Sequence, residues 1–133
     1  SMKVIVDTNV FVSGIIWSGK PAQIVSKWLG GEFELILSAE LLGEYLEIIE
    51  RLSKNPELAS QWRDTLVKRA TFVSVTQTVD ICRDPDDNFI LALGLASKAD
   101  YLITGDRDIL AISPFPIKIV SPAGFLIEAT RKH

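Results

Sequence analysis

The segment Val4-Ile5-Val6-Asp7-Thr8-Asn9 begins with three β-branched apolar residues and ends in three polar ones. A short apolar run of β-branched residues bounded by polar residues predicts a buried strand that leads into a turn. Ligands of parallel sheets bind beyond the carboxyl ends of the strands. Asp7 therefore lies where a functional carboxylate is expected.

Apolar segments of strand and helix type alternate along the rest of the chain. Further strands are expected over residues 33–37, 71–75, 101–104 and 117–120, and helices over residues 20–29, 38–52, 56–70, 86–98 and from 122 onward. Such alternation is typical of a parallel sheet with right-handed crossovers between its strands. We therefore predict an α/β protein of three α/β/α layers, with a central, mostly parallel sheet of four to five strands.

Length and composition indicate one domain. The chain has 133 residues, of which 47% are hydrophobic, and single domains usually contain about 50 to 250 residues. We expect one domain over residues 1–133, with Ser1 as the remnant of an expression tag. No apolar run approaches the roughly 18 residues of a membrane span, so we expect a cytoplasmic protein. The net charge of −3 provides no global attraction for a polyanion.

The composition also excludes several kinds of catalysis. Cys82 is the only cysteine and His133, the last residue, is the only histidine. An internal disulfide, a zinc site and a histidine-based triad are therefore not expected, and Cys82 is interpreted as a buried structural thiol. A general base would have to be a carboxylate or a water activated by a metal ion.

Four acidic residues stand at the ends or borders of apolar elements, and each also has a structural explanation. They are Asp7, Glu44, Asp87 and Asp106. Asp7 alone is equally well explained as the cap of the following turn. Glu44 borders the apolar face of its helix, which also contains Tyr45 and Leu52, whereas Glu47 and Glu50 point toward water; Glu44 is either a solvated edge residue or the acid that reaches an interior cleft.

The other two acids lie in acidic clusters. In Asp84-Pro85-Asp86-Asp87, ordinary helix-start chemistry explains Asp84 and Asp86. Asp87 exceeds what a cap needs, so we assign it a ligand role and Asp84 a supporting one at most. In Thr104-Gly105-Asp106-Arg107-Asp108, Asp106 either caps a short helix or serves the site. Function and turn chemistry both explain Asp106.

The conjunction of these acids favours function over structure. Four separate elements each deliver a carboxylate at a position compatible with one cleft edge, and clustered carboxylates bind hard divalent cations such as Mg²⁺ and Mn²⁺. A cation held in this way can activate water against a phosphate. The pattern predicts a metal-dependent phosphodiesterase.

The ordered set of Val4 to Asn9, Glu44, Asp87 to Ala92 and Tyr101 to Asp106 resembles the PIN domain family over nearly the whole chain. It is most similar to the VapC-like group of bacterial and archaeal toxin components of toxin-antitoxin pairs. The resemblance implies a Mg²⁺- or Mn²⁺-dependent ribonuclease with a three-layer fold. It places the family's four acids on Asp7, Glu44, Asp87 and Asp106, and its polar helpers on Asn9 and Thr104. Because related sequences differ in the spacing between the last two acidic positions, the resemblance also keeps Asp108 as a residue that shares or replaces the role of Asp106, the primary candidate.

The resemblance also implies partners, namely RNA, an antitoxin protein and a second copy of the chain. Four basic residues are weaker candidates for phosphate contacts, although scattered solubilising charge explains them too: Lys20, Arg51, Arg83 and Arg107. Two alternatives stay open. One is a catalytically inactive PIN-like binding module; the other is a phosphatase of the haloacid dehalogenase type, which requires a second Asp where this chain has Asn9.

Overall fold

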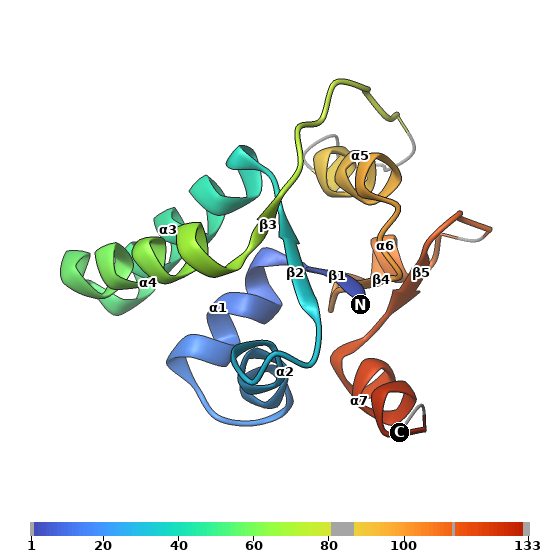
Figure 1. Cartoon of the computed structure of the whole chain (residues 1–133). Helices are drawn as coiled ribbons and strands as arrows, with labels where there is room; N and C mark the ends of the chain where they lie inside the picture. Colours follow the sequence, from blue (N-terminus) through green and yellow to red (C-terminus); the bar gives the residue numbers. More distant parts are fainter. Residues whose placement is uncertain (1, 81–86, 113, 132–133) are drawn as a thin grey trace.

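The structure is a computed structural model that describes residues 2–80, 87–112 and 114–131. Within these ranges the chain forms one five-stranded parallel sheet of order β3-β2-β1-β4-β5 (Figure 1). Its strands are β1 (Lys3–Val6), β2 (Glu34–Leu37), β3 (Thr71–Phe72), β4 (Tyr101–Ile103) and β5 (Lys118–Val120). Helices flank the sheet, and the predicted fold class is confirmed.

The helices largely match the predicted segments. They are α1 (Thr8–Ile16), α2 (Lys20–Leu29), α3 (Ala39–Ser53), α4 (Pro56–Arg69), α5 (Asn88–Ser97), α6 (Arg107–Leu110) and α7 (Pro122–Arg131). Strand β3 is shorter than predicted because its partner β2 ends at Leu37, whose carbonyl accepts the last bond from the Val73 amide at 2.9 Å. The predictions for Ser1, Cys82 and His133, and for the helix start at Asp86, lie outside the described residues.

Helix α1 is the element that the sequence analysis missed, because a turn was expected after β1. Asp7 is its N-cap residue, and one carboxylate oxygen accepts a hydrogen bond from the Thr8 amide at 2.8 Å. The helix is rich in β-branched residues, which have lower helix propensity than unbranched ones. Its packing against α2 and α3 compensates for that weak local preference.

The strand order reverses between β1 and β4. From β1 the chain proceeds outward through β2 to β3, and it then returns to place β4 and β5 on the other side of β1. Because crossovers in parallel sheets are almost always right-handed, such a reversal puts the connecting helices on opposite faces. Figure 1 shows α1, α3 and α4 to one side of the sheet and α5 to the other. A reversal of this kind opens a crevice at the carboxyl ends of the two central strands.

The core between the sheet and helices α1 to α4 is centred on an aromatic group. The Phe11 ring stacks on Tyr45 with centroids 4.4 Å apart, and it meets Trp28 and Trp62 edge-on, each at 5.9 Å. Phe11 and Tyr45 are both buried. Leu52, which was predicted to share this apolar face, is 48% exposed. It lies in the last turn of α3, at the end of the α3–α4 hairpin that projects from the sheet (Figure 1).

Gly14 allows α1 and α2 to approach closely. A Cβ atom at Gly14 would lie 2.5 Å from the Pro21 carbonyl oxygen and 2.6 Å from a Val25 methyl carbon. We expect Gly14→Ala to lower the free energy of unfolding by about 1 to 3 kcal/mol because backbone would have to move. Gly43, in α3, has open space around it, so Gly43→Ala should raise stability by about 0.5 to 1 kcal/mol. Urea denaturation measures the free energy of unfolding of both variants. Equal changes in stability for Gly14→Ala and Gly43→Ala would contradict the close approach of α1 and α2 at Gly14.

Among the described residues, no helix combines the length and the apolar character that crossing a bilayer requires.

Candidate active site

The ends of β1 and β4 are joined by a hydrogen-bonded group of side chains. The Asp7 amide donates to the Ile103 carbonyl at 2.8 Å, which extends the pairing of the two strands by one residue. The Thr104 hydroxyl donates to the Asp7 carboxylate at 2.7 Å and accepts from the Asp106 amide at 3.0 Å. Thr104 is completely buried, so it connects Asp7 to Asp106 from below the surface.

Thr8 connects this group to helix α3. Its hydroxyl donates to the Glu44 carboxylate, and its side chain is buried. Glu44 is partly buried whereas Glu47 and Glu50 are exposed, which confirms the prediction from the helical wheel. No role was predicted for Thr8 from the sequence, since a turn was expected there. Had a helix been predicted to start at Thr8, the position of Thr8 directly after Asp7 would have indicated a role in the site.

Tyr45 was assigned only to the apolar face of α3, but its hydroxyl also supports the site. It donates a hydrogen bond to the carbonyl of Val6, the residue immediately before Asp7. Complete burial raises the pKa of the Tyr45 phenol well above its ordinary value, and the nearby carboxylates of Asp7 and Glu44 raise it further. The phenol therefore stays protonated and remains a donor to the end of β1.

Burial also perturbs Asp7. Desolvation raises the pKa of its carboxyl group, hydrogen bonds from Thr104 and Thr8 oppose that shift, and the charge of Asp106 adds to it. Within residues 2–80, 87–112 and 114–131, the ion pairs do not include Asp7. A desolvated carboxylate beside a second acid is a place where a cation would relieve an unfavourable charge.

Asp106 and Asp108 differ in their surroundings. One Asp106 carboxylate oxygen accepts hydrogen bonds from the amides of Asp108, at 2.8 Å, and Ile109, at 3.3 Å, and thereby caps α6. Asp106 is partly buried, and its amide bonds to Thr104. Asp108 is exposed in the first turn of α6. Asp106 is thus both a helix cap and the acid that is joined to Asp7.

The remaining predicted site residues are not joined to Asp7 by the hydrogen bonds described above. Asp87 is partly buried at the N-cap position of α5, and its side chain forms no capping bond to the helix. Asn9 is exposed in the first turn of α1. Asp84 and Arg83 lie outside the described residues. A convergence of Asp87 with the other three acids, and a supporting role for Asn9, stay predictions.

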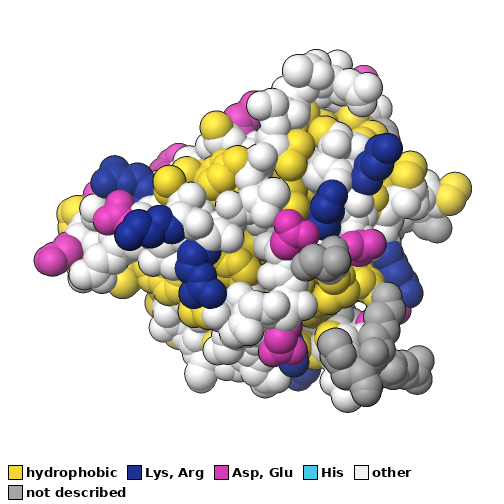
Figure 2. Space-filling model, viewed as in Figure 1, with side chains coloured by type: hydrophobic (Ala, Val, Ile, Leu, Met, Phe, Trp, Pro, Cys, Tyr) yellow, Lys and Arg dark blue, Asp and Glu magenta, His cyan; other side chains and the backbone are white. Residues whose placement is uncertain are grey.

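The basic candidates are dispersed. Arg107 is exposed immediately after Asp106, at the start of α6. Lys20 follows the far end of α1 and lines a cavity with residues of α7. Arg51 is exposed near the end of α3, about two turns beyond Glu44. On the face shown in Figure 2, basic and acidic side chains are interspersed. Of these three residues, only Arg107 adjoins the site.

Residues 3–108 match the family model described as PIN domain. The chain belongs to the PIN domain family. This PIN domain is 30% identical to an uncharacterized protein of Methanocaldococcus jannaschii, in an alignment that covers 96% of this chain and 91% of that protein. Its fold is similar to the crystal structure of VapBC2 from Rickettsia felis bound to a DNA fragment from their promoter. The TM-score is 0.64 at 16% identity, with 90% of this chain and 98% of that chain covered.

The donor set of this PIN domain suits a hard divalent cation. In the described part of the chain no group of three or more His, Cys, Asp or Glu side chains is arranged to hold a metal ion. Mg²⁺, however, usually binds through one or two carboxylates and keeps several waters. Asp7 and Asp106 are two oxygen-bearing side chains joined through Thr104, and the raised pKa of Asp7 indicates a carboxylate that lacks charge compensation.

Proposed function

We propose that this PIN domain is a divalent-metal-dependent endoribonuclease and the toxin component of a toxin-antitoxin pair. The observation that carries the proposal is the series of hydrogen bonds linking Glu44, Thr8, Asp7, Thr104 and Asp106 at the carboxyl ends of β1 and β4. PIN domains are generally nucleases. Open parallel sheets bind their ligands beyond the carboxyl ends of the strands, where the strand order reverses.

In the proposed mechanism Asp7 and Asp106 would hold Mg²⁺ or Mn²⁺, and Glu44 and Asp87 would complete the acidic site. The ion would activate a water and offset charge that develops on the phosphate. The protein supplies the positions: Thr104 and the Thr8 amide orient the Asp7 carboxylate, the Thr8 hydroxyl orients Glu44, and Tyr45 holds the end of β1. We propose that Arg107, which is exposed directly after Asp106, contacts a phosphate of the substrate. No covalent enzyme intermediate is required.

The toxin role and the partners rest on resemblance. The sequence resembles the VapC-like toxins, and the fold is similar to that of VapBC2. We propose an antitoxin protein and a second copy of the chain as partners on these grounds, and RNA as the substrate.

A metal-dependence assay tests the nuclease proposal. Purified protein is incubated with single-stranded RNA in Mg²⁺ or Mn²⁺, and the products are separated on a denaturing gel. We expect internal cleavage that excess chelator abolishes and added Mn²⁺ restores, because the acids must hold a cation before phosphate can approach them. Cleavage that persists in chelator would contradict the proposal.

A binding module without catalysis is the second candidate. It is favoured by the finding that the described acids include no ready group of three metal ligands. It predicts no cleavage with either metal, even though RNA or protein binding is measurable. The phosphatase interpretation is set aside, because the chain belongs to the PIN domain family.

A further inference from the structure

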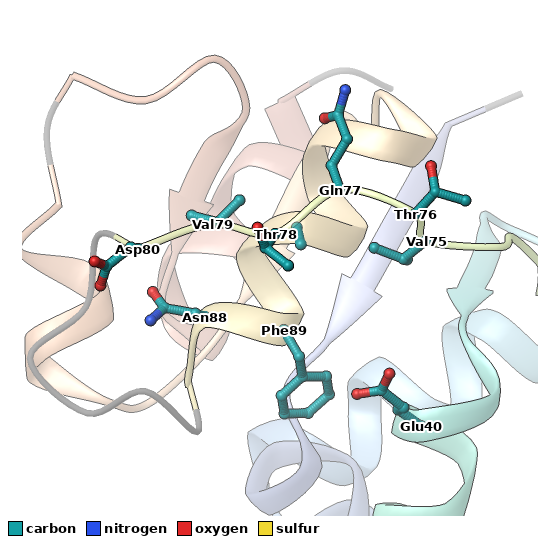
Figure 3. A pocket seen from close by; sticks show the side chains of 10 residues that line it. Glu40, Val75, Thr76, Gln77, Thr78, Val79, Asp80, Asn88 and Phe89 are labelled. Atoms are coloured by element: carbon teal, nitrogen blue, oxygen red, sulfur yellow. The ribbon is translucent and has the colours of Figure 1, made fainter.

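A cavity of about 470 Å³ lies beside the proposed active site, between the first turns of α3 and α5 and the segment 75–80. Figure 3 shows the Phe89 ring, from α5, and the Glu40 carboxylate, from α3, pointing into the same space, while Gln77 points away from it. Val75 and Ala92 add apolar surface. Thr76, Thr78, Asn88 and a second acid, Asp80, also line it, and Figure 3 shows Asp80 away from Phe89 and Glu40. Beside the Phe89 ring the cavity thus combines an aromatic face and apolar surface with the carboxylate of Glu40.

The cavity adjoins the acids on two elements. Glu40 lies one helical turn before Glu44 on α3, and Asn88, which also lines the cavity, directly follows Asp87. A polynucleotide whose phosphate reaches the acids would therefore bring a neighbouring nucleotide to this cavity. Single-stranded RNA is commonly bound by bases that are turned out of the stack and packed on aromatic side chains.

The side chains that line the cavity favour the base of a nucleotide over its phosphate. A carboxylate at Glu40 repels phosphate and attracts N–H groups. Guanine presents two N–H donors side by side on its Watson–Crick edge, which match the two oxygens of one carboxylate. Adenine, cytosine and uracil each place a ring nitrogen acceptor or a carbonyl next to their donor, and a carboxylate disfavours that pattern. The Phe89 ring offers the stacking surface that any base requires.

We propose that this cavity binds an unpaired guanine base of the RNA substrate, stacked on Phe89 and hydrogen-bonded through its two N–H donors to Glu40. This assignment rests on the proposed ribonuclease function, because that function supplies RNA as the ligand. It adds a specificity determinant that lies outside the acidic group: Glu40 reads the base, and Phe89 supports it.

Binding measurements separate this assignment from catalysis. The probes are fluorescently labelled seven-nucleotide oligouridines with one central G, A, C or U, and affinity is measured by fluorescence anisotropy with the Asp7→Asn variant as the parent. RNA integrity is checked on a gel. We expect the G-containing probe to bind about tenfold tighter than the all-U probe, as one good bidentate contact to a base would give.

Two substitutions in this parent test the individual contacts. Glu40→Gln should abolish the preference for G, because the amide has one acceptor oxygen and places its NH2 donor opposite the second N–H of guanine. Phe89→Leu, which keeps apolar volume at a residue packed partly against the core, should weaken binding of the G-containing probe about tenfold through lost stacking. The matched controls are Glu50→Gln, an exposed glutamate of the same helix, and Trp17→Leu, an aromatic residue that is 59% exposed. Neither control should alter the preference for G or the affinity for the G-containing probe.

The outcomes distinguish this assignment from the proposed function. Loss of the G preference in Glu40→Gln, together with a wild-type protein that cleaves no RNA with either metal, would support the cavity assignment and contradict the nuclease proposal. Equal affinity for all four probes in the parent, an unchanged preference for G in Glu40→Gln, or an unchanged affinity for the G-containing probe in Phe89→Leu would overturn the cavity assignment even if the wild type cuts RNA.

Discussion

Asp7→Asn is expected to reduce metal-dependent RNA cleavage at least about a hundredfold, which corresponds to about 2.7 kcal/mol of transition-state stabilisation. The amide keeps the size of the carboxylate and can still accept from the Thr8 amide as the N-cap of α1. It lacks the negative charge that would attract a cation. Initial cleavage rates at saturating Mn²⁺ measure the loss.

The same substitution should stabilise the metal-free protein. The pKa of Asp7 is raised above its ordinary value of 3.8, mainly by burial. The folded protein therefore binds the proton of Asp7 more tightly than the unfolded chain does. The stability that comes from this proton is fully present below pH 3.8 and is lost as the pH rises through the raised pKa. Above that pH the wild type carries a buried charge that Asp7→Asn does not.

Chemical denaturation at several pH values in the presence of chelator checks this expectation. The advantage of Asp7→Asn should grow as the pH rises from about 4 and level off above the raised pKa of Asp7. Asp64→Asn is the control, since Asp64 is 70% exposed on α4 and should alter neither stability nor cleavage. A variant Asp7→Asn that cuts RNA at the wild-type rate would remove Asp7 from the mechanism.

Phe11→Ala is expected to cause the largest loss of stability, about 3 to 5 kcal/mol. Phe11 is 1% exposed and contacts three aromatic side chains that come from α2, α3 and α4. Its removal would leave a cavity that these elements can close only in part. Typical domains have a total stability of about 5 to 15 kcal/mol, so the variant could lose a large part of its stability.

Urea unfolding followed by tryptophan fluorescence measures this effect, because Trp28 and Trp62 both contact Phe11. Phe72→Ala is the matched control: Phe72 is 43% exposed in the edge strand β3 and should cost much less. Similar losses for the two variants would show that the aromatic group around Phe11 does not anchor the core.

Strong local signals explain why most elements could be predicted. Helix α2 begins and ends where Pro21 and Gly30 predicted, and Ser38 and Asn55 cap α3 and α4 through their side chains. Helix α1 could not be predicted in this way, because its β-branched residues favour strands and its stability depends on contacts with α2 and α3. The local rules failed where tertiary packing outweighed propensity.

Some residues of the candidate site could likewise be predicted from local signals in the sequence, and others could not. The end of an apolar strand indicated Asp7 and Asp106, and helical periodicity indicated Glu44. Thr8 and Tyr45 carried no comparable signal, since a hydroxyl next to an acid or within an apolar face has ordinary structural explanations. Their roles became visible through contacts between residues far apart in the chain: Thr8 with Glu44, and Tyr45 with Val6.

The sequence by itself determined the alternation of strands and helices and the carboxylate-rich set of ionisable side chains on which the proposed chemistry depends, because apolar periodicity and side-chain type are local properties. Only the tertiary structure decided which polar groups meet. The reversal of strand order between β1 and β4 brings Asp7 next to Thr104, and the packing of α1 on α3 brings Thr8 to Glu44. Hydrogen bonds act over about 3 Å, so partners distant in sequence are defined only once the chain has folded.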